Sequence, residues 1–284
     1  MASVLPAPLL DPRRMDTVWV RGPEAVRFLQ DLIAQDLERV APGEVTRSLW
    51  LGPQGKLVEI PWVLRGDDEV GFVVDAGRGS GLAASLRRYR IRVKADIEEG
   101  ESGVVILEGG SVAKGSWSNG ARIEADISLP GVRRTFVSSP APDLEEAPPE
   151  LAEGLRIAAG EPLMGVDVDE STIPQESGLV ESAVALDKGC FLGQELVARI
   201  DSRGGRVPRL LRGLRLVPGV GAGDELRRED RVVGKVSSTG EHPLLGPVGL
   251  ALVRREVEPG ASVSAAAGEV RVELLPMTGY TPRP

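Results

Sequence analysis

Residues 187–195 of this 284-residue chain read Asp-Lys-Gly-Cys-Phe-Leu-Gly-Gln-Glu. Cys190 in this stretch is the only cysteine of the protein, and Lys188 stands two residues before it. The residues that follow, 194–200, have the composition of a helix, so Cys190 is expected just ahead of a helix N-terminus. A nearby cation and a helix N-terminus both stabilise a thiolate relative to a thiol. We therefore predict a reactive cysteine. The alternative is a small buried hydrophobic residue, as free cysteines often are.

The overall charge narrows the classes of partner. The chain has 34 lysine and arginine residues against 42 aspartate and glutamate residues, a net charge of -8. This balance argues against a non-specific nucleic-acid binder, whose field should be positive, so no direct nucleic-acid partner is expected. A basic run at residues 87–94 contains an interleaved aromatic residue and could contact an anion or RNA. A solvated face at a helix-to-strand transition is the favoured interpretation.

Cysteine and histidine are too rare for the common metal sites. With one cysteine and one histidine, His242, the chain can form neither an intrachain disulfide nor a Cys/His zinc site. An iron–sulfur cluster, which needs about four such ligands, cannot be fully ligated by this chain alone. The N-terminal residues lack a basic region followed by an apolar run, and no apolar stretch approaches the ~18 residues of a membrane helix. These features predict a cytoplasmic protein without a membrane partner.

Apolar patterning predicts an α+β region in the first half of the chain. Residues 16–20 alternate as a strand, and Gly22-Pro23 marks the start of a helix whose apolar positions recur up to Val40. The further expected elements are two strands within 48–64 joined by a turn at 52–56, a strand at 70–74, a helix at 81–89, and strands at 92–97, 104–107, 122–127 and 133–137. One helix among several strands with glycine turns favours α+β over a repeating βαβ sheet.

The second half of the chain begins with a different composition. Residues 140–149 are rich in proline and acidic residues, which predicts a linker or an exposed loop. From 210 to 275, short strands alternate with turns, and this pattern is typical of a small barrel or sandwich. His242 precedes Pro243 in one of the expected loops, so a surface histidine is the default interpretation.

The octapeptide at 188–195 resembles the signature of the YgfZ family of folate-binding proteins. These proteins are relatives of the glycine cleavage T protein, an aminomethyltransferase. The resemblance spans most of the chain, includes the Pro-Gln-Gly-Lys turn at 53–56, and is strongest from Arg156 to Leu214. It implies a T protein-like fold that is α+β with a C-terminal β-barrel. The implied division is a folate-binding region at 1–205, with an inserted α+β unit at about 65–140, followed by the barrel at 206–284.

The resemblance also implies which residues contact the folate. Glu176 matches the T protein glutamate that anchors the pterin, because a carboxylate can accept two parallel hydrogen bonds from a flat heterocycle. Arg209 matches an arginine that precedes the barrel. Glu59 is the nearest acidic match to an aspartate that lies against the folate, although a solvent-facing strand residue is an equal alternative. Asp75 replaces the asparagine of a Val-Val-Asn-Ala motif, which argues against transferase chemistry.

Arginines accumulate after the thiol motif in an otherwise acidic protein. They could attract the glutamate carboxylates of a folate, or they could be exposed side chains that lie over apolar neighbours. The set comprises Arg199, Arg203, Arg206, Arg209, Arg212 and Arg215.

The function implied by the resemblance is a tetrahydrofolate-binding accessory protein for iron–sulfur cluster assembly or repair. Cys190 would act as a redox thiol or transient ligand, with Lys188 stabilising its thiolate. The rest of the motif would support the loop: Gly189, Gly193, Gln194 and Glu195. The implied cofactor is tetrahydrofolate or a derivative, and iron–sulfur enzymes or assembly proteins would be transient partners. Two alternatives stay open: a folate-dependent aminomethyl or methyl transferase, and a scaffold that no longer uses the pocket.

Overall fold

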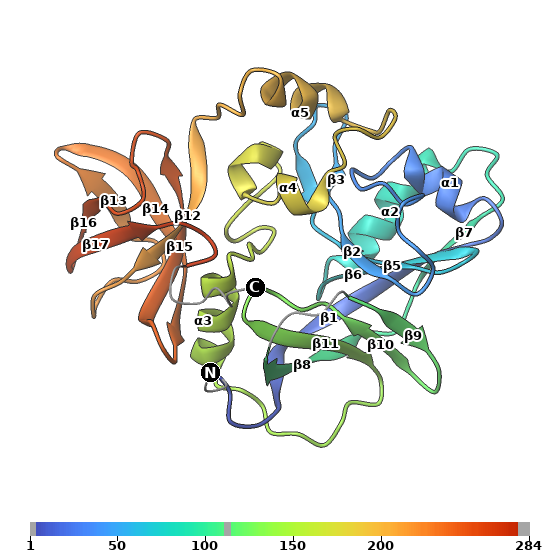
Figure 1. Ribbon diagram of the computed structural model, residues 1–284, viewed down its shortest axis with the longest axis horizontal. Coiled ribbons are helices and arrows are strands. Elements are labelled where there is room, and N and C mark those ends of the chain that lie inside the picture. The colour runs from blue at the N-terminus through green and yellow to red at the C-terminus, as the bar shows by residue number, and fades with distance from the viewer. Residues whose placement is uncertain (1–3, 111–114, 278–284) are drawn as a thin grey trace.

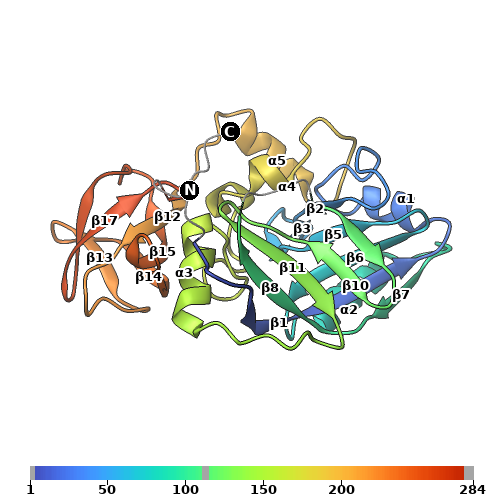
Figure 2. The ribbon, with the colours of Figure 1, turned by 60° about the horizontal axis from the view of Figure 1, so that its bottom comes forward.

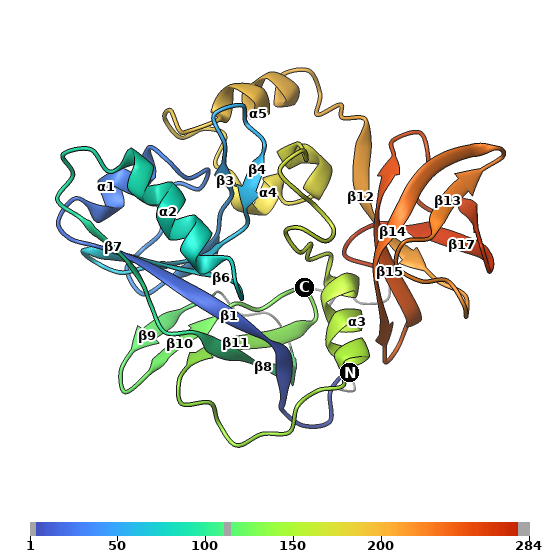
Figure 3. The same ribbon diagram turned by 180° about the vertical axis from the view of Figure 1, so that it is seen from behind.

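The computed structural model describes residues 4–110 and 115–277 (Figure 1). A large sheet and a closed barrel lie at opposite ends of the molecule, and helix α3 (Pro149–Ala159) stands between them. Figure 3 shows the same arrangement from behind. No helix among the described residues is both long and apolar enough to span a membrane.

The sheet has nine strands, in the order β2-β5-β6-β1-β8-β11-β10-β9, with β7 paired to β1 off this path. All pairings are antiparallel. The strands are β1 (Leu9–Arg21), β2 (Val45–Arg47), β5 (Trp62–Arg65), β6 (Glu69–Asp75), β7 (Asp96–Glu99), β8 (Gly103–Gly109), β9 (Trp117–Asn119), β10 (Ile123–Asp126) and β11 (Val132–Ser138).

Both faces of the central strands are covered. In β1, Val18 and Val20 belong to a core beneath helices α1 (Ala25–Gln30) and α2 (Gly79–Tyr89), while Trp19 faces the opposite core with Leu155 of α3. Successive side chains of a strand point to opposite faces. A strand that is covered on both faces therefore has an almost continuous run of apolar residues in its sequence. Figure 2 shows the helices and the second half of the sheet on either side of β1.

The C-terminal strands form a closed barrel in the order β12-β15-β14-β13-β16-β17. This result confirms the barrel and excludes the sandwich. Closure removes sheet edges, and alternate apolar residues such as Leu214, Val236 and Val253 fill the interior. The strands are β12 (Arg209–Arg215), β13 (Glu225–Arg228), β14 (Arg231–His242), β15 (Gly246–Arg254), β16 (Ser262–Ala265) and β17 (Gly268–Glu273).

Helix α3 contacts the barrel through its backbone. A Cβ atom added to Gly154 would lie 2.2 Å from the carbonyl oxygen of Glu241 in β14. A Cβ atom on Gly240 would lie 2.3 Å from the backbone nitrogen of Gly154. Only glycine allows two backbones to approach so closely, so the helix and the strand are fitted together at this pair of residues.

Two expectations about secondary structure are wrong in part. The helix expected from residue 23 to Val40 ends at Gln30, because the Gln30 side chain accepts a bond from Leu37 N–H and donates to Asp36, which stabilises a set of turns. The strand expected at 92–97 begins only at Asp96. The proline-rich segment is a mainly exposed loop, one of its two expected forms, and Leu10 exchanges backbone hydrogen bonds with its residues 145 and 147.

His242 is buried, which corrects the expectation of a surface histidine. It is the last residue of β14 and is only 1% exposed, because α3 packs over this end of the strand. Its Nδ1 atom accepts a hydrogen bond from Leu244 N–H at 3.2 Å. Burial, aided by the charge of Arg215, lowers the pKa of His242 to about 4.

We expect the stability of the protein to fall between pH 6.5 and pH 4 through His242. The unfolded state binds the proton near pH 6.5 and the folded state only near pH 4, so the free energy of unfolding decreases by up to about 3 kcal/mol as the pH falls through this window. Urea denaturation at several pH values would measure the effect against His242→Gln. Equal pH dependence of the two proteins would contradict it.

Candidate functional site

Cys190 is exposed in the loop before helix α5 (Gln194–Asp201). This finding excludes the alternative of a buried hydrophobic cysteine. Gln194 supports the loop as expected, since its Oε1 atom accepts a bond from Phe191 N–H at 3.1 Å. Glu195 and Gly189 are exposed. Among the described residues, no group of three or more His, Cys, Asp or Glu side chains is arranged to hold a metal ion.

The hairpin turn at 52–56 and the thiol motif at 188–195 are far apart in the chain and are in contact in the structure. Strands β3 (Trp50–Leu51) and β4 (Leu57–Glu59) form the expected hairpin, whose turn contains Gly55. Gly55 and Gly193 both have positive φ angles, and a Cβ on Gly55 would lie 2.7 Å from the carbonyl oxygen of Gly193. The hairpin turn therefore supports the thiol loop through a contact that requires glycine on both sides.

Lys188 is bound to backbone carbonyls. Its Nζ atom donates hydrogen bonds to the carbonyl oxygens of Gln30 (2.6 Å), Gln35 (2.7 Å) and Ile33 (3.0 Å). An ammonium has three donors, so all of them are used to tie the thiol loop to the turns after α1. Burial lowers the pKa of Lys188 to about 8. Stabilisation of the Cys190 thiolate by this cation stays a prediction.

Lys188→Met is expected to lower the free energy of unfolding by about 2 kcal/mol, because it leaves three carbonyls without their charged donor. Chemical denaturation would measure the change. Lys235→Met is the matched control, since Lys235 is exposed and its side chain makes no hydrogen bond among the described residues. An effect of Lys188→Met as small as that of the control would show that the three hydrogen bonds of Lys188 contribute no stability.

Glu176 and Arg209, both expected at the folate site, form an ion pair. Arg209 Nε donates to Glu176 Oε1 at 3.1 Å, and Arg209 Nη2 donates to Oε2 at 3.3 Å. Glu176 Oε2 also accepts from the backbone N–H of Ile173 at 3.0 Å, which caps the 3-10 helix η1 (Pro174–Ser177). Glu176 is 2% exposed, so its carboxylate holds a turn together within the protein.

Glu59 is ion-paired with Arg78, whose backbone N–H donates to the carbonyl oxygen of Asp75. Glu59 is buried rather than solvent-facing, and its Oε2 atom accepts from Arg78 Nε at 2.5 Å. Burial raises the pKa of Glu59, against the bond from Ile60 N–H and the charge of Arg78. Burial also raises the pKa of Asp75, against the charge of Arg13. No hydrogen bond or ion pair between described residues joins this group to the Glu176–Arg209 pair.

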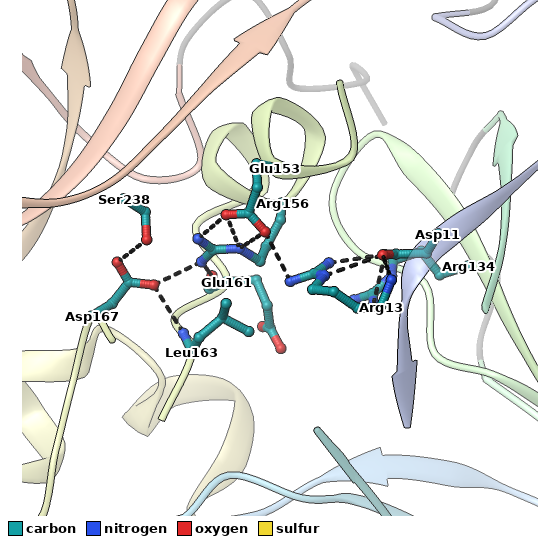
Figure 4. Close-up of polar contacts among 9 residues, drawn as sticks. All are labelled: Asp11, Arg13, Arg134, Glu153, Arg156, Glu161, Leu163, Asp167 and Ser238. Carbon is teal, nitrogen blue, oxygen red and sulfur yellow. Dashed lines mark hydrogen bonds and ion pairs between the residues drawn. The ribbon is translucent and has the colours of Figure 1, made fainter. Parts of the chain in front are cut away.

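A chain of buried charges connects the sheet, α3 and the barrel (Figure 4). Arg156 lies at its centre and donates to Glu153 (2.6 Å), to Asp167 (2.8 Å) and to the backbone carbonyl of Glu161. On the barrel side, Asp167 Oδ1 accepts from Ser238 Oγ at 2.6 Å. On the sheet side, the chain continues from Glu153 through Arg13 to Asp11 and Arg134.

A pocket of about 460 Å³ opens between the sheet, the loops around η1 and the barrel. Its polar lining includes the buried ion pair of Arg47 with Glu161, and the Arg47 guanidinium lies 4.5 Å from the centroid of the Trp62 ring. Arg212 also lines it, and the Arg212 side chain makes no hydrogen bond or ion pair within residues 4–110 and 115–277. The remaining lining is mainly apolar, and includes Leu129, Ala159, Leu179, Leu210, Leu211, Leu274 and Leu275.

Two of the four residues expected at the folate site line other cavities, whereas Glu59 and Glu176 line none of the three. Asp75 lines an enclosed space of about 20 Å³ that shares Arg47, Trp62 and Glu161 with the larger pocket. Arg209 lines an open groove of about 750 Å³ on the outer side of the barrel wall, beside Asp169. The other arginines after the thiol motif do not form a single lip, since Arg199, Arg203 and Arg206 are exposed and line none of these cavities.

Arg47, Trp62, Glu161 and Arg156 are site residues that sequence patterns did not identify. Arg47 and Trp62 belong to short strands, where an arginine and a tryptophan are ordinary. Glu161 and Arg156 lie in the segment that resembles the T protein, but the resemblance gave them no role. No local signal distinguishes a buried arginine from an exposed one.

The fold defines the class of protein. A solved structure of the glycine cleavage system aminomethyltransferase T from Bartonella henselae matches with a TM-score of 0.80 at 18% identity, and the match covers 94% of this chain and 85% of that one. The chain therefore has the aminomethyltransferase fold with a C-terminal β-barrel, and the predicted fold class is confirmed. No family model matches the chain.

Relatives among curated proteins narrow the class further. An iron–sulfur cluster assembly factor IBA57 homolog from Phaeosphaeria nodorum is 28% identical over 231 residues, which cover 73% of this chain and 55% of the relative. The tRNA-modifying protein YgfZ of Edwardsiella ictaluri is 26% identical over 214 residues, which cover 65% of this chain and 64% of the relative. The chain thus spans less than two thirds of the length of either relative. These similarities, together with the shared fold, confirm the predicted kinship with the YgfZ family.

Proposed function

We propose that this protein binds tetrahydrofolate or a derivative and serves as an accessory factor in the assembly or repair of iron–sulfur clusters in other proteins. Cys190 is the reactive thiol, used as a redox group or transient ligand. The observation that carries the proposal is the exposed Cys190 in a loop fixed from three sides, by Lys188, Gln194 and the Gly55 turn. Iron–sulfur enzymes or assembly proteins are its transient partners, and a cytoplasmic location is part of the proposal.

The residues of the 460 Å³ pocket fit a folate in size and chemistry. Ligand pockets of this kind measure roughly 300–1,000 Å³ and combine an apolar lining with a few polar groups. The pocket supplies an aromatic ring for stacking, a carboxylate paired with a guanidinium, and a further guanidinium without a partner. When bound, a reduced folate would supply one-carbon or reducing chemistry.

In this proposal, the residues that the resemblance assigns to folate binding support the structure around the pocket. Glu176 and Arg209 hold the η1 turn, and Ser177 of this turn lines the pocket together with Leu179 just after it. Asp75 lines the small enclosed space that shares Arg47, Trp62 and Glu161 with the pocket. A half-buried carboxyl at position 75, where the transferase motif has an amide, favours an accessory factor over the alternative transferase.

One experiment with two arms tests the proposal. Cells carrying Cys190→Ala should lose most of the activity of their iron–sulfur enzymes, with Cys190→Ser as the matched variant that keeps the size of the side chain but not the thiolate. Calorimetric titration of the purified wild type with tetrahydrofolate should release heat and give a one-to-one complex. Normal iron–sulfur enzyme activities in the Cys190→Ala cells would contradict the role of the thiol. Absence of heat in the titration would leave only the scaffold alternative. Turnover of a labelled one-carbon folate by the wild type would favour the transferase alternative.

A further inference from the structure

A hollow of about 440 Å³ lies between α1 and residues 89–93, at the end of the molecule away from the barrel (Figure 1). Phe28 of α1 and Leu32 from the turn after it contribute apolar surface. Tyr89 at the end of α2 and Val93 in the following segment add to this surface, and both are half-buried. Large side chains that fill apolar pockets dominate the binding energy of protein interfaces. The hollow therefore suits one large apolar side chain of a partner.

The hollow adjoins the thiol loop. The backbone N–H of Leu192 donates to the carbonyl oxygen of Asp31 at 3.1 Å, and Asp31 lines the hollow. The Leu192 side chain packs against the hydrophobic cluster that contains Phe28 and Leu32. Cys190 comes two residues before Leu192, so their Cα atoms are at most about 7 Å apart. A protein segment seated in the hollow is therefore held beside the exposed thiol.

The segment at 90–95, on one side of the hollow, has an unusual backbone conformation. Arg92 has a φ angle of 57°, in the left-handed region that residues other than glycine rarely adopt. Glu24 fixes the segment, because its Oε2 atom accepts from Lys94 N–H at 2.6 Å and its own N–H donates to the Lys94 carbonyl at 3.4 Å. Ile91 is left 75% exposed, more than any other large hydrophobic side chain of the described residues. Strain held in this way by its surroundings is found at binding sites.

Unpaired cations surround the hollow in a protein whose net charge is -8. Four exposed side chains in or next to its lining make no hydrogen bond or ion pair within residues 4–110 and 115–277: Arg27, Arg88, Arg92 and Lys94. The lining contains two carboxylates, Glu24 and Asp31, and that of Glu24 is occupied by the backbone of Lys94. The excess of positive charge is complementary to a partner segment that carries carboxylates.

We propose that this hollow docks an acidic segment of the iron–sulfur partner protein, with one large apolar side chain in the hollow and its carboxylates on Arg27 and Arg92. This inference rests on the proposed function, in which the partner reaches Cys190, and it names the surface that brings the partner there. The basic run at 87–94 is then part of an interface instead of a solvated face. RNA fits less well, because the apolar lining and the two carboxylates offer nothing to a phosphate.

Disulfide exchange with short peptides tests the docking site through Cys190. Each peptide is supplied as its mixed disulfide with cysteamine. The Cys190 thiolate attacks the peptide sulfur, a new disulfide forms, and cysteamine leaves as the thiol. The acidic probe is acetyl-Cys-Gly-Gly-Glu-Leu-Glu-amide, whose two glycines span the distance from the thiol to the hollow. One control peptide has serine in place of leucine, and the other has lysine in place of both glutamates.

Mass spectrometry at equilibrium with cysteamine gives the exchange constant of each peptide. The acidic probe should exceed the serine control by about tenfold, since burial of a leucine side chain contributes at least that much. It should exceed the lysine control by about three- to tenfold, as expected for two pairs of exposed charges. Equal exchange constants for the three peptides would overturn the docking site.

A double variant and a matched control locate the effect. Arg27→Gln combined with Arg92→Asn should lower the exchange constant of the acidic probe about three- to tenfold, to that of the lysine control. Asparagine tolerates the left-handed backbone at 92, and circular dichroism would verify the fold. Arg255→Gln should keep the wild-type preference, because Arg255 is exposed just after β15 and its side chain has no partner among the described residues.

Enzyme activities in cells separate this inference from the proposed function. The double variant should lower iron–sulfur enzyme activities as Cys190→Ala does, and Arg255→Gln should not. Full activity with the double variant, beside a loss with Cys190→Ala, would overturn the docking site and leave the proposed function standing. Binding of a labelled oligouridine by the wild type but not by the double variant would assign the hollow to RNA and also overturn it. Normal activity with Cys190→Ala would overturn the proposed function itself.

Discussion

Arg156→Met is expected to lower the free energy of unfolding by about 3–5 kcal/mol, the usual cost of removing one partner from a buried ion pair. The Arg156 side chain is 1% exposed and contacts Glu153 and Asp167 as well as a backbone carbonyl. Methionine fills much of the volume but leaves the buried Asp167 without a counter-charge. For a domain whose total stability is about 5–15 kcal/mol, this loss is a large fraction of the free energy of unfolding.

Equilibrium unfolding in urea at pH 7 would measure this loss. Arg122→Met is the control, because Arg122 pairs with Glu124 at 2.8 Å on the surface, and such pairs contribute at most about 1 kcal/mol. If both substitutions cost the same, the buried chain of charges in Figure 4 does not hold the two ends of the molecule together.

Gly154→Ala is expected to cost about 3 kcal/mol or more and to loosen the barrel. An alanine in a helix is ordinarily better than glycine by about 1 kcal/mol. Here the added Cβ would lie 2.2 Å from the Glu241 oxygen and 2.4 Å from its carbonyl carbon. Both atoms are backbone, so neither can rotate away, and overpacking outweighs the gain in helix propensity.

The matched substitution is Gly81→Ala in α2, where a Cβ atom would meet nothing within 4 Å. It should raise the free energy of unfolding by up to about 1 kcal/mol. Thermal unfolding followed by circular dichroism would give both values. Opposite signs are required, since the Cβ added at 154 meets backbone atoms and the Cβ added at 81 meets open space. A stabilising Gly154→Ala would mean that α3 and β14 are farther apart than described.

Patterns in the sequence predicted the fold where they were regular. The short strands separated by turns after 210 indicated the barrel or sandwich, and closure depended on pairing between β12 and β17, which no local pattern contains. The predicted helix up to Val40 failed because the apolar spacing of Ile33 and Leu37 is also satisfied by turns, once the Gln30 side chain bonds the backbone. Long-range contacts decided both outcomes.

The candidate site was predictable in part. The thiol motif and the glutamate and arginine at 176 and 209 were identified from the resemblance, and the structure joins the last two as an ion pair. The resemblance could not tell whether Glu176 faces a ligand or the protein, because that depends on the position of Arg209. Lys188 was expected to act on the thiol, whereas its bonds run to carbonyls more than 150 residues earlier in the chain.

The position of α3 has a consequence for ligand selection. Gly154 fixes the helix against the barrel backbone, and the charges from Glu153 to Arg13 fix it against the sheet. Trp62 and Arg212 sit on these two bodies and bound the same pocket. The separation of the two bodies across the pocket is therefore set by α3 and not by the compound that enters it.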